Sequence, residues 1–177
     1  MKRVRKLLVA GGLVAALAIA AGLYWFQPWK LWQDDTVREA FPVAVSTPGS
    51  PGSPSARNPE PKTLATGDFI SHEHGTTGKA RILQLADGTR VLRLTGLDTS
   101  NGPDLRVWLT DAPVQEGKAG WHVFDDGRYQ SLGKLKGNKG DQNYPLPADL
   151  DLRDYRSVTI WCDRFDVSFG AAELAAA

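Results

Sequence analysis

The chain has 177 residues, a formal net charge of +1 at pH 7 and one cysteine. A charge so close to balance excludes a broad basic surface for nucleic acid, and a single cysteine excludes a scaffold held together by internal disulfides.

The N-terminus is a basic tail, residues 1–6, followed by an uncharged apolar run from Leu7 to Phe26. Twenty residues in a helix span about 30 Å, the thickness of the hydrocarbon core of a bilayer. Basic flanks stay in the cytoplasm, so we expect a signal anchor in the cell membrane, with a single span and the C-terminal domain outside the cytoplasm. Ala18-Ile19-Ala20 also has the small-x-small pattern of a signal-peptidase site, which leaves cleavage as the alternative. Either way the domain is extracytoplasmic.

Residues 27–65 are expected to form a juxtamembrane segment and a disordered linker. Asp34 to Ala40 has a capping aspartate and precedes Pro42, which predicts one or two helical turns. Ser46 to Lys62 is dominated by Pro, Gly and Ser, which predicts a flexible stalk because such a segment buries little apolar surface.

Residues 66–174 are expected to form one all-β domain, a β-sandwich or small barrel. Two β-prone runs flank Asp87-Gly88, which predicts a hairpin. Apolar and polar residues alternate over 104–111, which predicts a half-buried strand, and residues 137–140 have the composition of a turn. Two further strands are expected at 157–162 and 166–174. Short strands separated by turns about every 10 residues are typical of sandwiches and barrels.

Cys162 lies at the end of its expected strand, on the same face as Val158 and Ile160 and opposite Trp161. A free cysteine on an apolar face is often a small core residue. A strand end beside a tight turn is also a common place for functional groups, and Arg164 would lower the pKa of a thiol that lay close to it. Cys162 is therefore the candidate redox centre and the candidate cofactor ligand, with packing as the alternative.

His72 and His74 form an H-x-H pair whose side chains would point the same way on a strand, which makes them a candidate metal site. No histidine closely follows Cys162 and the only methionine is Met1, so the pattern of a blue-copper site is absent. There is no C-x-x-C-H motif, which excludes covalent c-type haem. Non-covalent haem on a histidine or on Cys162 is permitted but not required, so the cofactor stays undefined.

Catalytic signatures are weak. The chain has no Gly-x-Ser-x-Gly elbow, and the sequence leaves open whether it is an enzyme. Loops around Tyr144 and Trp121 are the candidate surface if the domain instead serves binding.

Four stretches occur in the order found in a known family: TGDFISHEHGTTGKARI, VLRLTGLDTSNGPDLRVWL, SLGKLKGNKGDQNYPLP and SVTIWCDRFDVSFGAAEL. Together they resemble the DM-thirteen domain, the electron-transfer DM domain of Skeletor-type proteins, in its bacterial membrane-anchored form. The resemblance covers about residues 66–174. It implies a β-sandwich that takes part in electron transfer at the cell surface through one cysteine, either as a thiol or as the holder of a prosthetic group such as haem. Here that cysteine is Cys162.

Two functions follow as hypotheses. The first is a membrane-anchored extracytoplasmic redox domain centred on Cys162, which needs a separate redox partner because the chain has no room for a second domain. The second is a non-enzymatic binding or adhesion module that meets another cell-surface protein and keeps Cys162 as a structural residue.

Overall fold

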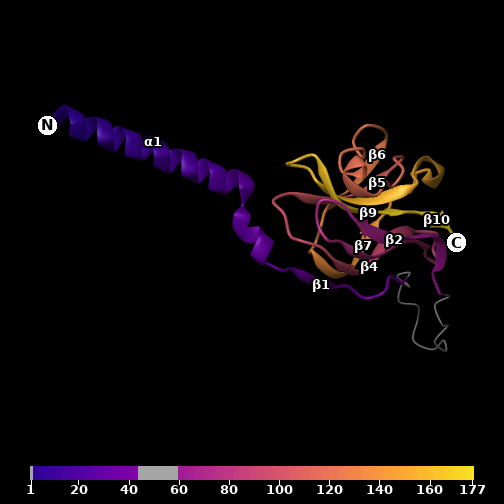
Figure 1. Ribbon diagram of the computed structural model, residues 1–177. Coiled ribbons are helices and arrows are strands. Elements are labelled where there is room, and N and C mark those ends of the chain that lie inside the picture. Colours follow the sequence, from indigo (N-terminus) through magenta and orange to yellow (C-terminus); the bar gives the residue numbers. More distant parts are fainter. Residues whose placement is uncertain (1, 44–59) are drawn as a thin grey trace, which may run out of the picture.

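The computed structural model describes residues 2–43 and 60–177. Helix α1 (Lys2–Phe26) has no buried residue and is long and apolar enough to cross a membrane. It projects away from the β domain (Figure 1). Gln27 adopts a left-handed conformation (φ 44°), and Pro28 opens the short 3₁₀ helix η1 (Pro28–Trp32). Because a left-handed residue stops α-helical hydrogen bonding, the chain turns at Gln27 towards the domain.

Ten strands follow. Their bounds are β1 (Thr36–Arg38), β2 (Lys62–Ser71), β3 (Thr77–Gln84), β4 (Arg90–Asp98), β5 (Leu105–Thr110), β6 (Tyr129–Lys134), β7 (Lys139–Pro145), β8 (Ser157–Cys162), β9 (Val167–Glu173) and β10 (Ala175–Ala176). Two short 3₁₀ helices, η2 (Gly117–Gly120) and η3 (Leu152–Asp154), lie in the connections.

The strands form one strongly curled half-barrel sheet in the order β1-β7-β4-β3-β2-β9-β8-β5-β6, with β10 paired to β2. Neighbours are antiparallel except β1 and β7, which are parallel. The expected all-β class is confirmed. The sheet is continuous, because β2 pairs with β3 on one side and with β9 on the other.

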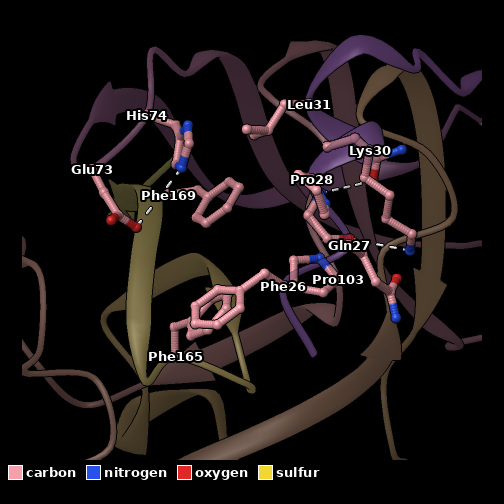
Figure 2. A pocket seen from close by; sticks show the side chains of 12 residues that line it. Phe26, Gln27, Pro28, Lys30, Leu31, Glu73, His74, Pro103, Phe165 and Phe169 are labelled. Atoms are coloured by element: carbon pink, nitrogen blue, oxygen red, sulfur yellow. Dashed lines mark hydrogen bonds and ion pairs between the residues drawn. The ribbon is translucent and has the colours of Figure 1, made fainter. Parts of the chain in front are cut away.

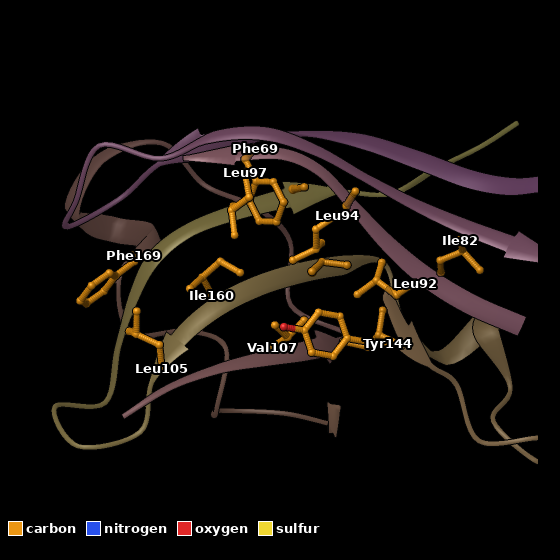
Figure 3. Close-up of a cluster of buried hydrophobic side chains, with 14 of the residues drawn as sticks. Phe69, Ile82, Leu92, Leu94, Leu97, Leu105, Val107, Tyr144, Ile160 and Phe169 are labelled. Atoms are coloured by element: carbon orange, nitrogen blue, oxygen red, sulfur yellow. The ribbon is translucent and has the colours of Figure 1, made fainter. Parts of the chain in front are cut away.

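The main core lies inside the curl, between the two halves of the sheet (Figure 3). Leu92 and Leu94 come from one half, and Val107 and Ile160 from the other; all four are essentially inaccessible to solvent. Burying each such side chain contributes about 1.5–3 kcal/mol, so the facing apolar surfaces are what hold the curl closed. The predicted β3–β4 hairpin is confirmed, and Gly88 supplies the positive φ (85°) of its turn.

A second apolar cluster covers the outer face of β5 and β8. It contains Trp108, Trp161 and Phe124, with Ala112 and Ala171. Trp108 and Trp161 point outward from the sheet, and the segment between β5 and β6 contributes Phe124 and Ala112 against them. The prediction that β5 is half-buried is therefore wrong: five of its six residues are buried.

The juxtamembrane segment forms a strand where helical turns were predicted, and that prediction is wrong. Residues 36–38 form β1 beside β7, and the flanking Asp35 N–H donates to Asn138 Oδ1 at 2.7 Å. Most of the predicted stalk, residues 46–59, lies outside the described residues, while Lys62 already begins β2.

Candidate functional site

Cys162 ends β8, in register with Leu105 on β5 and Val167 on β9. Its side chain is fully buried in the main core and is not in a disulfide. Trp161 packs in the outer cluster, so the predicted opposition of these two neighbours across the strand is confirmed.

The environment of the thiol favours its protonated form. Burial raises the pKa of Cys162, while backbone groups of Arg164, Phe165 and Asp104 act in the opposite direction and the Glu73 carboxylate adds to the rise. The guanidinium of Arg164 instead donates to the carbonyls of Tyr24 and Trp25, at 3.2 and 2.8 Å. Arg164 thus acts to lower the pKa of the thiol through its backbone only, and burial outweighs it.

A cleft of about 310 Å³ lies close to this strand end, between the C-terminal end of α1 with η1 and the loops of the β domain (Figure 2). Its walls include Phe26, Phe165 and Phe169. Phe165 belongs to the turn that follows Cys162, and its N–H donates to the Cys162 carbonyl at 3.2 Å. Cys162 itself does not line the cleft.

The two histidines of the H-x-H pair separate, because β2 ends at Ser71 before either of them. His72 is buried towards the outer cluster, where it stacks on Phe124 with ring centroids 5.7 Å apart. Its Nε2–H donates to the Gln115 carbonyl at 3.1 Å, so its Nδ1 accepts from the Ser168 hydroxyl at 2.7 Å. Burial lowers the pKa of His72.

His74 lies in the cleft instead. Its ring lies against Phe169, with centroids 3.9 Å apart, and its Nε2 is 3.8 Å from a carboxylate oxygen of Glu73. Because Ser168 and Phe169 are consecutive residues of β9, His72 and His74 contact opposite faces of that strand. The expectation that they point the same way is wrong.

The structure bears on two of the ligand sets considered from sequence: a metal site and Cys162 as the ligand of a haem. Over residues 2–43 and 60–177, no group of three or more His, Cys, Asp or Glu is arranged to hold a metal ion. The sulfur of Cys162 is enclosed by core side chains, so the residues around it do not fit a haem without opening the core.

The sequence reasoning missed a stack of aromatic rings on the outer face of the sheet. Tyr129, which is 46% exposed, stacks on Trp108 with centroids 4.1 Å apart, and Trp108 stacks on Trp161 at 5.0 Å. The stack therefore runs from the surface to the residue bonded to Cys162. The available signal was that Trp108 and Trp161 both lie opposite the core face of their strands, but only the β5–β8 register brings them together.

The candidate binding loop also differs from expectation. Tyr144 belongs to β7 and is 2% exposed, and its hydroxyl donates to Gln142 Oε1 at 2.7 Å. Tyr144 is thus a core residue and offers no surface to a partner.

Comparison with known proteins identifies a family. The family model described as Electron transfer DM13 matches residues 68–174, which is more than half of the chain. No curated protein and no solved structure matches. The family segment contains Cys162, the strands β3 to β9 and most of the cleft wall contributed by the β domain. The chain belongs to the electron transfer DM13 family.

Proposed function

We propose that this chain is a membrane-anchored redox protein that transfers electrons outside the cytoplasm, with Cys162 as its redox centre. The family match supports electron transfer, and the exposed apolar helix supports the anchor. The basic residues ahead of that helix favour a cytoplasmic N-terminus and an extracytoplasmic domain. A redox partner on the same side of the membrane completes the transfer.

One observation carries the proposal: the ring stack Tyr129–Trp108–Trp161 links the surface to Trp161, the peptide-bonded neighbour of Cys162, whose sulfur lies on the opposite face of β8. Electron transfer through protein becomes slower as the gap between groups widens, and stacked rings leave only short gaps. A purely structural cysteine has no need of such a connection. Because the chain has one cysteine, a redox cycle at Cys162 itself must change the state of one sulfur or pass through an external thiol.

The test uses full-length protein purified from its own membranes in mild detergent. Visible spectra of the oxidised and reduced protein and a film voltammogram are recorded for the wild type, Cys162→Ser and Cys162→Ala. We expect a redox response that both cysteine variants lose while their folded circular dichroism is kept. Trp108→Leu should slow the response, and Trp121→Leu, outside the stack, should leave it unchanged.

A response that persists in both cysteine variants would remove Cys162 from the proposal. A wild type with no response in either measurement would remove electron transfer altogether.

A second function, a non-enzymatic binding module, is favoured by a specific observation. Cys162 has no accessible surface and a raised pKa, as expected for a residue that only packs. The same voltammogram separates the two functions, because a binding module has no response to lose.

A further inference from the structure

We propose that the cleft between α1 and the β domain binds the ring of a membrane quinone or quinol. The identification of the quinone as a redox partner rests on the proposed function. The existence of the binding site rests on the cleft alone. The cleft has four features that match such a ligand: flat aromatic walls, polar groups at opposite sides, little net charge and a position at the end of the membrane helix.

The walls suit a flat ring. Phe26 of α1 stacks on Phe165 with centroids 5.6 Å apart and an interplanar angle of 21°. Phe169 lies against His74, with 33° between the two rings. Figure 2 shows these rings around the open space, with Pro28 and Pro103 closing it on the helix side. Aromatic faces and proline rings give a planar ligand extensive contact at little cost in side-chain entropy.

The polar groups lie on two sides of this apolar space. His74 and Glu73 are on one side and Lys30 is on the other (Figure 2). A quinone ring carries oxygens at opposite ends, and it needs a hydrogen-bond partner at each. Burial lowers the pKa of His74, so a neutral imidazole is favoured, which can donate to a carbonyl or accept from a hydroxyl. Lys30 Nζ donates to the Gly102 carbonyl at 3.2 Å, and the flexible lysine side chain can turn from there to donate to a ligand on the other side.

The charges of the lining favour a neutral ligand over an anionic lipid headgroup. Lys30 and Glu73 contribute one charge of each sign. A phosphate bound to Lys30 would lie in the same cleft as the negatively charged Glu73 carboxylate, which disfavours it because like charges repel. A plain acyl chain would make no hydrogen bond to the imidazole of His74 or to Lys30, so it would not use the polar groups on the two sides of the cleft.

The position of the cleft at the end of α1 would give a membrane quinone access to it. Phe26 is the last residue of the membrane-capable helix and also a wall of the cleft. With α1 in a bilayer, the cleft lies at the outer membrane interface, where Trp25, Trp29 and Trp32 are exposed as interfacial aromatics are. A ring in the cleft can then keep its isoprenoid tail in the bilayer alongside α1.

The test is a titration of full-length protein in nanodiscs with decylubiquinone, followed by quenching of tryptophan fluorescence. We expect saturable quenching in the wild type and binding about tenfold weaker in His74→Leu, the size of effect that loss of one buried hydrogen bond produces. His122→Leu is the matched control, because His122 is exposed and bonds the Asp166 carbonyl outside the cleft. Lys30→Met tests the opposite side independently, and thermal melts establish that each variant is folded.

Three outcomes would overturn the site. The first is quenching that does not saturate, and the second is a decylubiquinone affinity in both His74→Leu and Lys30→Met equal to that of the wild type. The third is displacement of decylubiquinone by an equal concentration of decanol, which would indicate a groove for any alkyl chain. If decylubiquinone quenches in phosphatidylcholine nanodiscs but phosphatidylglycerol abolishes that quenching, the cleft would be assigned to an anionic lipid headgroup and the quinone overturned.

Cys162→Ser keeps the cleft lining, so it should bind decylubiquinone normally. If Cys162→Ser binds the quinone and keeps an unchanged redox response, the proposed function is wrong but the quinone site stands. If the redox response depends on Cys162 but the protein does not bind the quinone, the proposed function stands and the quinone site is wrong.

Discussion

The Cys162 thiol is protected in the folded chain by its position on the inner face of β8. Core side chains enclose it, and burial raises its pKa, so the nucleophilic thiolate is scarce. Chemistry at this sulfur therefore requires an electron to reach it through the protein, or the strand end to open.

Thiol reactivity tests this protection. With Ellman's reagent at pH 8, we expect Cys162 to react slowly in native protein and fast after unfolding in urea. The control is Asp126→Cys in a Cys162→Ser background, which carries an exposed thiol and should react at once. Equal rates for the two native proteins would contradict the buried placement.

The pH dependence has a definite sign. The folded pKa of Cys162 lies above its ordinary value of 9.0, so the folded state holds its proton after the unfolded state has lost it. The stabilisation from this thiol is complete below pH 9.0 and is lost as the pH rises through the folded pKa. Urea melts between pH 8 and 11 should show a steeper loss of stability in the wild type than in Cys162→Ala. Parallel curves would contradict the shift.

Tyr144 gives a second prediction at this scale. Its hydroxyl donates to the buried Gln142 Oε1 and accepts from the Lys136 N–H at 3.1 Å, and burial raises its pKa to about 12. Tyr144→Phe removes both bonds, so we expect a loss of about 1–2 kcal/mol in unfolding free energy. Tyr129→Phe, on an exposed side chain, should change it by less than about 0.5 kcal/mol. A Tyr144→Phe melt that matches the wild type would show that these bonds contribute nothing.

At the scale of elements, Asn138, from a distant part of the sequence, is one of the side chains that hold the start of β1 beside β7. Asn138 is buried, and its amide donates to Asp34 Oδ1 at 2.9 Å and to the Thr99 carbonyl at 2.7 Å. Its Oδ1 accepts from the Asp35 N–H. Asn138 thereby ties the segment before β1 to the loop after β4.

Asn138→Ala should therefore loosen the start of this segment at the sheet edge. It removes three hydrogen bonds of a buried amide, for an expected loss of about 2–4 kcal/mol and faster hydrogen exchange over residues 34–39. Asn101→Ala is the matched control, because its bonds to the Gln33 carbonyl and Asp35 are exposed and should matter little. Unchanged exchange at 34–39 in Asn138→Ala would show that β1 is held by other contacts.

An element can be predicted from the sequence when the residues that stabilise it are close to it in the chain, and is missed when they are distant. The β3–β4 hairpin is predicted because its signal, Asp87-Gly88 between β-prone runs, is local. The β-strand at 36–38 is missed because its pairing with β7 lies about a hundred residues away. Burial of Trp108 is missed for the same reason, since its cover comes from a later loop.

The candidate site follows the same rule. The face of Cys162 follows from strand alternation, which is local. The direction of the histidines does not, because β2 ends before His72. The cleft combines Phe26, His74 and Phe165, and no local pattern joins residues so far apart in the chain.

At the scale of the whole molecule, a small set of contacts fixes α1 against the β domain. Arg164 bonds the carbonyls at the end of α1 and lies over the Trp25 ring at 5.4 Å, and Phe165 stacks on Phe26. The turn after Cys162 is thus also the turn that contacts the end of the membrane-capable helix α1. A change in the tilt of α1 would reach the redox candidate through two or three residues.

Orientation and retention of α1 can be tested together by labelling cysteines in living cells. In a Cys162→Ser background, Asp126→Cys should react with a membrane-impermeant maleimide in intact cells. Val4→Cys should react only after lysis, because the basic tail keeps residue 4 in the cytoplasm. An Asp126→Cys thiol protected until lysis would reverse the orientation. If signal peptidase cuts after Ala20, the mature chain loses residue 4, and its label never appears on the protein that carries the β domain. An uncleaved signal anchor retains residue 4 and its label. In that case the helix that ends at Phe26 also keeps the cleft at the membrane surface.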